Sequence, residues 1–200
     1  MNDGGRLPVE GRLVRLRDVT LADADLLDAW NAARDGGFND FGPRDPVNRE
    51  VLADRPLRND KNGTLIVEVV ATGEPIGTVG WHGVYYGPGP LSMAWNIGID
   101  LVPEGRGQGF GTEAQRLLAG YLFATSGVNR VEASTDIENV VEQRSLTKAG
   151  FHRDGVVRGS QYRAGAYHDL VVYSRLRGDA TEPDDAYDPA RRDAAVPSRS

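Results

Sequence analysis

Residues 103–118, PEGRGQGFGTEAQRLL, combine a cluster of glycines with an amphipathic run that follows at once. The glycines occupy four alternating positions, Gly105, Gly107, Gly109 and Gly111. Each glycine costs backbone entropy, so such a cluster indicates a backbone conformation or a close approach that side chains would prevent. From Thr112 onward the apolar residues follow helical spacing. The stretch therefore predicts a glycine-rich turn that leads directly into a helix.

A glycine-rich turn before a helix is a favourable place for a phosphate group. The first backbone N–H groups of a helix lack intrahelical partners, and the aligned peptide dipoles attract an anion. Successive glycine amides can also curl around phosphate oxygens. Gly109 and Gly111 lack the Cβ atoms that would hold a phosphate away, and Arg106 can add a charged hydrogen bond. We expect a phosphate-bearing ligand here, with a plain flexible loop as the alternative.

Three phosphate-binding patterns compete for this stretch. A P-loop requires Gly-Lys-Ser/Thr, which the sequence lacks. A dinucleotide fingerprint matches at Gly109, Gly111 and Ala114, but residues 103–108 separate it from the preceding strand, whereas that turn normally follows its strand closely. The third pattern, Arg-x-x-Gly-x-Gly, is met from Arg106 to Gly111. It fits best, and an NAD(P)-dependent oxidoreductase is the weaker alternative.

Composition and charge limit the class of protein. The chain has 200 residues, no cysteine and a formal net charge of −6. Half of this charge lies in residues 178–200, so the remainder lacks the basic excess of nucleic-acid binders. No apolar run reaches about 18 residues, and the first residues lack the apolar core of a secretory signal. We expect a cytoplasmic protein without nucleic-acid or membrane partners, and the scattered histidines predict no metal site.

The segment 11–177 alternates strand and helix patterns, which is typical of one α/β or α+β domain. Strands are expected at 12–19, twice within 64–84, and at 92–102, 129–135 and 170–176. Helices are expected after Thr20, near 46–54, from Thr112 onward and over 139–151. Residues 1–10 and the acidic, proline-containing stretch 178–200 have little to bury, so both are expected to be flexible.

The Arg-x-x-Gly-x-Gly turn resembles the pyrophosphate loop of the GCN5-related N-acetyltransferase (GNAT) superfamily, which binds acyl-coenzyme A (acyl-CoA). Residues 96–123 resemble that family's strand, loop and helix in order, and ENVVEQRSLTKAGF, residues 138–151, resembles its next helix. Residues 11–30 and 150–176 are similar to the opening and the C-terminal hairpin of the RimJ/RimL-like ribosomal-protein branch. The resemblance covers residues 11–177.

The resemblance implies a GNAT fold, a central, mostly antiparallel mixed sheet flanked by helices. The family's fourth and fifth strands, here 92–102 and 129–135, splay apart and hold the pantetheine arm of acetyl-CoA between them. The cofactor-binding residues that the motifs imply are Ile99, Leu101, Val102, Arg106, Gly107, Gln108, Gly109, Phe110, Gly111, Thr112 and Asn139. Dimers are common in the family, and because no sequence pattern identifies an interface, a homodimer is left open.

The implied reaction is direct transfer of an acyl group, expected to be acetyl, to a primary amine of a protein N-terminus or a small molecule. It needs a base, because an ammonium cannot attack, backbone N–H groups for the oxyanion, and a proton source for the departing thiolate. This sequence departs from the family at two positions. Glu142 stands where relatives often carry Ser, and Asn96 stands where many carry Glu.

Several side chains are therefore candidates for the chemistry. The candidate catalytic residues are Glu68, His82, Asp100 and Glu142. The candidate acceptor-pocket residues are Trp81, Tyr85, Trp95 and Asn96. Because the usual Ser and Glu are missing, a CoA-binding module with weak or no catalysis, used for sensing or assembly, is the alternative function.

Overall fold

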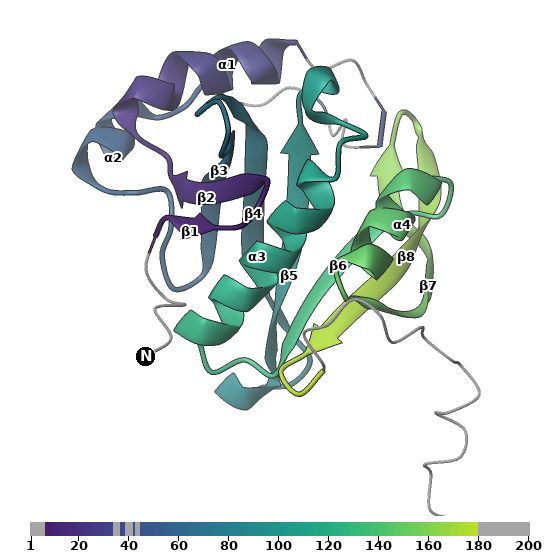
Figure 1. The fold of residues 1–200 in the computed structure, drawn as a ribbon. Helices are drawn as coiled ribbons and strands as arrows, with labels where there is room; N and C mark the ends of the chain where they lie inside the picture. Colours follow the sequence, from purple (N-terminus) through teal and green to yellow (C-terminus); the bar gives the residue numbers. More distant parts are fainter. Residues whose placement is uncertain (1–6, 34–36, 39–41, 43–44, 180–200) are drawn as a thin grey trace, which may run out of the picture.

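A single mixed sheet organises the chain. The computed structural model describes residues 7–33, 37–38, 42 and 45–179. Within them an eight-stranded sheet has the order β1-β2-β3-β4-β5-β6-β8-β7 (Figure 1). The pairs are antiparallel except for β5 and β6, which are parallel. The expected fold class, a mostly antiparallel mixed sheet with flanking helices, is confirmed.

The secondary structure follows the expected order of elements. The strands are β1 Val9–Glu10, β2 Val14–Asp18, β3 Asn62–Val69, β4 Pro75–Tyr85, β5 Met93–Leu101, β6 Arg130–Asp136, β7 His152–Arg163 and β8 Ala166–Leu176. The α-helices are α1 Ala24–Ala32, α2 Arg49–Asp54, α3 Phe110–Thr125 and α4 Val140–Lys148. Strand β1 lies within residues 1–10, which were expected to be flexible. Beyond Asp179 the predicted tail lies outside the described residues.

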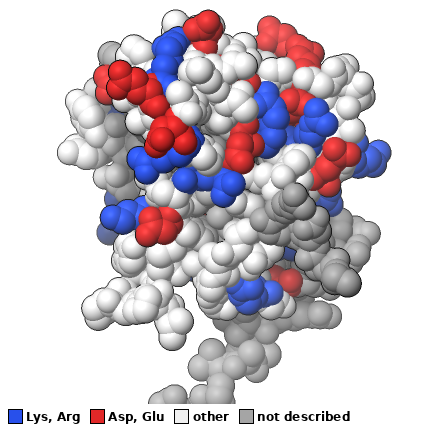
Figure 2. All heavy atoms as spheres, turned by 90° about the vertical axis from the view of Figure 1, so that its left-hand side faces the viewer, with Lys and Arg blue, Asp and Glu red and all other residues white. Residues whose placement is uncertain are grey.

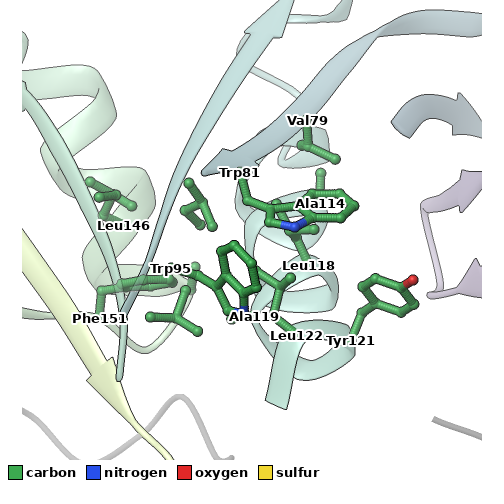
Figure 3. Packing of buried hydrophobic residues seen from close by; sticks show 14 of the residues in the cluster. Val79, Trp81, Trp95, Ala114, Leu118, Ala119, Tyr121, Leu122, Leu146 and Phe151 are labelled. Atoms are coloured by element: carbon green, nitrogen blue, oxygen red, sulfur yellow. The ribbon is translucent and has the colours of Figure 1, made fainter. Parts of the chain in front are cut away.

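Helices cover the two faces of the sheet. Side chains alternate between the faces along each strand, and Val79, Trp81 and Trp95 point to the face covered by α3 (Figure 3). Trp81 meets Tyr121 of α3 edge to face, with ring centroids 6.0 Å apart. On the opposite face Ile66 belongs to a smaller cluster with residues of α1 and α2. The sheet thus separates two cores, one under α3 and α4 and one under α1 and α2.

The parallel strands β5 and β6 pair over a short distance only. Their register joins Trp95 to Val131, Asn96 to Glu132 and Ile97 to Ala133. Beyond Ile97, β5 continues to Leu101 and β6 to Asp136, but they are not paired with each other there. The expected splay of these two strands is therefore present. It leaves an opening in the sheet beside the beginnings of α3 and α4.

A buried carboxylate holds α3 against the N-terminal strands. Glu113, in the first turn of α3, is 5% exposed and accepts hydrogen bonds from the N–H groups of Arg12, Leu13 and Val14, at 3.1, 2.5 and 2.8 Å. Burial alone would raise the pKa of Glu113. The three backbone hydrogen bonds and the charge of Arg116 outweigh burial and hold the pKa below its ordinary value. This carboxylate fixes where the helix starts relative to the sheet.

Replacing this carboxylate should weaken the fold in a pH-dependent way. Glu113→Gln should lower the free energy of unfolding at neutral pH by about 1–3 kcal/mol, because buried N–H groups lose a charged acceptor. The folded-state pKa lies below the ordinary value of 4.5, so the carboxylate's contribution is complete above that pH and is lost below it. Denaturant titrations should show the gap between wild type and variant narrowing from about pH 5 to about pH 3. Glu50→Gln, at an exposed site on α2, is the control. If wild type and the Glu113 variant differed equally in free energy of unfolding at both pH values, the proposed role of the Glu113 carboxylate would be wrong.

Candidate functional site

A groove of about 810 Å³ opens where β5 and β6 separate. Residues from both faces of the sheet line it. From the α3 and α4 side these include Ile99, Leu101, Val102, Arg106, Gly107, Gly109, Gly111, Thr112, Asn139 and Glu142. From the α1 and α2 side they include Leu27, Trp30, Phe38, Val47, Thr78 and Asp100. The groove therefore passes through the opening of the sheet and joins its two faces.

The glycine-rich turn forms one end of this groove. Gly107 and Gly109 have φ values of +75° and +85°, a left-handed conformation that favours glycine. Gly105 is buried, and a Cβ there would lie 3.3 Å from Ile76. Gly111 would tolerate a Cβ at ordinary contact distances, so its role is space in the groove rather than backbone conformation. The turn thus delivers the first N–H groups of α3 to the groove, where they lack intrahelical partners.

Cationic side chains surround this end of the groove. Arg106 lines it, and its Nε donates to the carbonyl oxygen of Leu101 at 2.9 Å, which folds the turn back onto β5. Arg144 and Lys148 of α4 line the groove as well. Three cations beside a helix N-terminus suit a ligand with several phosphate charges. Arg144 and Lys148 were not predicted as site residues from the sequence, although their i, i+4 spacing places them on one face of α4.

A chain of hydrogen bonds joins α3 to α4 along the groove. The hydroxyls of Thr112 and Ser145 lie 3.0 Å apart, and Ser145 donates to Gln115 Oε1 at 3.1 Å. Gln115, which is 2% exposed, donates through Nε2 to Glu142 Oε1. Asn139 begins α4, where its Oδ1 accepts from the N–H of Glu142 at 3.3 Å. Gln115 was missed from the sequence, although a polar residue three positions after Thr112 shares its helix face.

Burial changes the acidity of Glu142. It raises the pKa of this carboxyl above its ordinary value, and the hydrogen bond from Gln115 only partly opposes the shift. Glu142 therefore keeps its proton at a higher pH than an exposed glutamate does. A carboxyl in this state can donate a proton to a basic atom in the groove.

Asp100 of β5 lies on the opposite face of the sheet from its neighbour Ile99. It follows Ile99 in β5 and pairs in register with Thr78 of β4, so its side chain points to the α1 and α2 side. It lines the groove and is half-buried. The nearby wall is apolar and includes Trp30 and Phe38. The groove thus presents one carboxylate on each face of the sheet, Asp100 and Glu142.

Asn96 and His82 lie where the strands are still paired, and neither lines the groove. Asn96 Nδ2 donates to Glu132 Oε1 on β6 at 3.4 Å, and the other oxygen of Glu132 accepts from Tyr86 Oη at 2.6 Å and from Arg130 Nε at 2.7 Å. His82 is exposed and sits opposite Asn96 in the register of β4 and β5. Sequence reasoning did not link Glu132 to Asn96, because the contact joins two strands.

Glu68 lies away from the groove, between β2 and β3. It is buried and forms ion pairs with Arg15 and Arg17, the latter at 2.6 Å. Burial alone would raise the pKa of Glu68, but the hydrogen bonds from Arg17 and Arg15 lower it overall. Figure 2, which views this side of the molecule, shows acidic and basic side chains interspersed. The placement supports a role in joining strands rather than in proton transfer.

The predicted acceptor-pocket aromatics do not line the groove. Trp81 and Trp95 belong to the core under α3 (Figure 3), and they border a second hollow of about 540 Å³ near the end of that helix. Tyr85 is exposed at the end of β4. Two predicted cofactor residues also lie outside the groove lining. Gln108 donates to the carbonyl oxygen of Glu104 at 2.6 Å, and Phe110 packs against the main core.

Two further features bear on the expectations. Among the residues that the structure describes, no cluster of three or more His, Asp or Glu side chains is arranged to hold a metal ion. Within the same part of the chain, none of the helices has the length and apolarity needed to span a membrane.

Comparisons with known proteins agree with this geometry. A family model described as an acetyltransferase (GNAT) domain matches residues 13–152. The uncharacterized N-acetyltransferase YoaA of Bacillus subtilis (strain 168) is 33% identical over 106 residues, which cover 53% of this chain but only 58% of that protein. The uncharacterized N-acetyltransferase p20 of Bacillus licheniformis is 29% identical over 168 residues, which cover 81% of this chain and 92% of that protein.

Solved structures share the fold. The ribosomal-protein-S5-alanine acetyltransferase from Vibrio fischeri superposes with a TM-score of 0.72 and 19% sequence identity, over 87% of this chain and 98% of that one. At this identity the likeness concerns the fold alone. The family model spans well over half of the chain and includes the glycine-rich turn, helices α3 and α4 and the splayed strands. On this evidence the chain belongs to the GNAT family of N-acetyltransferases.

Proposed function

We propose that the chain transfers an acetyl group from acetyl-CoA to a primary amine, of a protein N-terminus or of a small molecule. One observation carries the proposal. A single groove crosses the sheet, with a phosphate-suited turn on one face and a carboxylate, Asp100, within an apolar wall on the other. Such a groove lets an anionic donor and an amine acceptor enter from opposite faces and meet in the opening.

The residues of the turn and of β5 fit acetyl-CoA. The N–H groups of Gly109, Gly111 and Thr112 would hold the diphosphate, with Arg106 beside them and two more cations on α4. Beyond Ile97 the edge of β5 is not paired with β6 and lies along the groove, where a pantetheine arm would run beside it. When bound, acetyl-CoA supplies an acyl group activated as a thioester.

Two carboxyl groups of the chain would move the protons. Asp100 would accept the proton of the incoming ammonium, directly or through a water molecule, and leave a neutral amine. Glu142, whose pKa burial raises, would donate a proton to the departing sulfur on the other face. Asn139 begins α4 and holds the backbone N–H of Glu142, so it would orient this carboxyl.

The alternatives receive less support. Only β5, α3 and β6 form a parallel β-α-β unit in the described residues, whereas a dinucleotide-binding domain is built from several such units. A CoA-binding module without catalysis is motivated by Asn96, which cannot act as a base. Asp100, four residues further along β5, offers the missing carboxylate to the groove.

CoA binding at the turn is tested by one pair of variants. Gly109 is left-handed, and Asn and Asp tolerate this conformation best among residues with a Cβ. Gly109→Asp and Gly109→Asn should therefore share any backbone strain and differ in charge. We expect the Asp variant to bind CoA at least about tenfold more weakly than the Asn variant, because its charge opposes the diphosphate. Calorimetry gives both Kd values; equal values would place the diphosphate elsewhere.

The base is tested by Asp100→Asn. At neutral pH this variant should lower kcat/KM for the amine by about 100-fold while leaving the Kd of CoA unchanged. The loss should shrink as the pH approaches the pKa of the free amine, because more of the amine is already neutral. Release of free thiol over a pH series measures this. A loss that is the same at every pH would argue against Asp100 as the base.

The proton donor is tested by Glu142→Gln. A carboxyl with a raised pKa holds its proton below that pKa and loses it above, so the wild-type kcat should fall on the alkaline side of its optimum. The variant should lose about 10- to 100-fold in kcat and lack this alkaline decline. Glu138→Gln, at an exposed position just before α4, is the matched control. An alkaline decline that persists in the Glu142 variant would assign it to another group.

A further inference from the structure

The second hollow lies at the opposite end of α3 from the glycine-rich turn. Its volume of about 540 Å³ is in the range of small-molecule sites. Its walls come from the residues just before β3, from the connection between β4 and β5, and from the last turns of α3. Because α3 has 16 residues with a rise of about 1.5 Å each, the hollow lies about 24 Å from the turn. It shares no lining residue with the groove and is a separate feature.

Buried aromatic rings form the inner wall of this hollow. Trp81, Trp95 and Tyr121 line it, and each of them is at most 6% exposed. Trp81 meets Tyr121 edge to face, and Trp95 lies close to both along α3 (Figure 3). A further ring gains from stacked or edge-to-face contacts with such side chains. The hollow therefore suits a flat aromatic group.

The indole N–H groups of the two tryptophans differ in their partners. Trp95 Nε1 donates to Ser126 Oγ at 3.0 Å. None of the described residues accepts a hydrogen bond from Trp81 Nε1. In this part of the chain the one fully enclosed side-chain nitrogen or oxygen without a partner is Arg175 Nε, so the Trp81 nitrogen opens to a space. Because Trp81 lines the hollow, an acceptor atom placed there can receive the hydrogen bond that a buried indole normally forms.

The other polar groups of the lining favour an uncharged ligand. Among the described residues that line the hollow, Arg58 is the one cation, and its Nε donates to Asp18 Oδ1 at 2.6 Å, which balances its charge. Asp60, the one acidic residue among them, is exposed. An anion would meet Asp60 without gaining an unpaired cation. The hydroxyls of Thr125 and Ser126 already donate to carbonyl oxygens of α3, which leaves the N–H of Trp81 as the donor for a ligand.

We propose that this hollow binds a small, uncharged aromatic molecule whose carbonyl group, or a similar acceptor, receives a hydrogen bond from Trp81 Nε1. The site goes beyond the proposed function and does not depend on it. The depth of the donor selects a small molecule over a protein surface, because Trp81 is 6% exposed and a flat partner at the rim would not reach it. Leu91 and Met93, from the connection between β4 and β5, would add apolar contacts.

The first experiment follows the indole N–H signals of the intact chain by NMR. The chain has three tryptophans, of which Trp30 lies in the groove, and Trp→Phe variants assign the three signals. The probes are acetophenone and ethylbenzene, which differ by a carbonyl group. We expect acetophenone to move the Trp81 signal to lower field in a saturable way and to leave the Trp30 signal in place. Its Kd should be at least about fivefold below that of ethylbenzene, the gain from one hydrogen bond.

Two outcomes of this titration would overturn the proposal. They are the absence of a saturable shift at Trp81 and equal Kd values for the two probes. The titration is then repeated with saturating CoA, which should leave the Kd of acetophenone unchanged because the groove is at the other end of α3. Displacement of acetophenone by CoA would place the probe in the groove and would also overturn the proposal. A chain that binds acetophenone but not CoA would contradict the proposed function alone.

A pair of leucine variants tests where the probe lies. Leu91 lines the hollow and is 91% exposed, so Leu91→Ala should leave the fold intact. This variant should raise the Kd of acetophenone about threefold, because the ligand loses apolar contacts. Leu21→Ala, at an exposed leucine that lines neither the hollow nor the groove, is the matched control. The same Kd in the Leu91 variant and in wild type would overturn the placement at this rim.

A pair of tryptophan variants tests the hydrogen bond itself. Trp81→Phe keeps an aromatic wall but removes the donor, so acetophenone and ethylbenzene should bind with equal Kd values, followed through the Trp95 signal. Trp95→Phe removes an N–H group that is already engaged with Ser126 and should keep the preference for acetophenone, followed through the Trp81 signal. A preference for acetophenone that persists in Trp81→Phe would overturn the role of this N–H group.

Discussion

The pairing of β5 with β6 stops after three residues, and the groove lies in the opening that this leaves. Parallel neighbours in a sheet normally continue side by side, because each backbone N–H and C=O group needs a partner. Beyond Ile97 the facing edge of β5 no longer has β6 as its partner, and Ile99 and Leu101 line a groove instead. The opening exposes this edge of β5 to the groove and also connects the two faces of the sheet. A fully paired strand would remove both properties.

Helix α3 is hydrogen-bonded to both sides of that opening. Its first turn is fixed to the N-terminal half of the sheet, where Glu113 holds the backbone of β2 and of the residues just before it. Within the same turn of the helix, Thr112 and Gln115 form hydrogen bonds with Ser145 and Glu142 of α4, which packs with the C-terminal half of the sheet. The same short stretch is thus fixed to the N-terminal half of the sheet, connects through α4 to the C-terminal half, and carries the first N–H groups of α3 at the glycine-rich end of the groove. A second connection lies on the opposite face, where Arg163, at the end of β7, donates a hydrogen bond to the carbonyl oxygen of Gly37.

The sequence predicts those parts of the site that lie close together in the chain. The glycine turn and the helix after it share one continuous pattern, and the left-handed Gly107 and Gly109 explain two of its four glycines. Contacts between distant segments were not predictable in this way. Arg163 lies 126 residues from Gly37, and Glu68 lies more than fifty from Arg15 and Arg17. The alternation of β4 and β5 groups Trp81 with Trp95, but it does not say which face meets α3. For this reason both tryptophans were predicted at the acceptor site, whereas they lie in the core.

The roles proposed for the two carboxyl groups, Asp100 and Glu142, depend on the faces of the sheet on which they lie. Under the proposed function one proton must leave the amine and another must reach the sulfur. Asp100 and Glu142 lie on opposite faces of the sheet, and burial raises the pKa of Glu142 above its ordinary value. A pair of acids whose surroundings differ in this way can divide the roles of base and acid. The splay permits this division, because only an opening in the sheet lets two side chains on opposite faces act on one reacting centre.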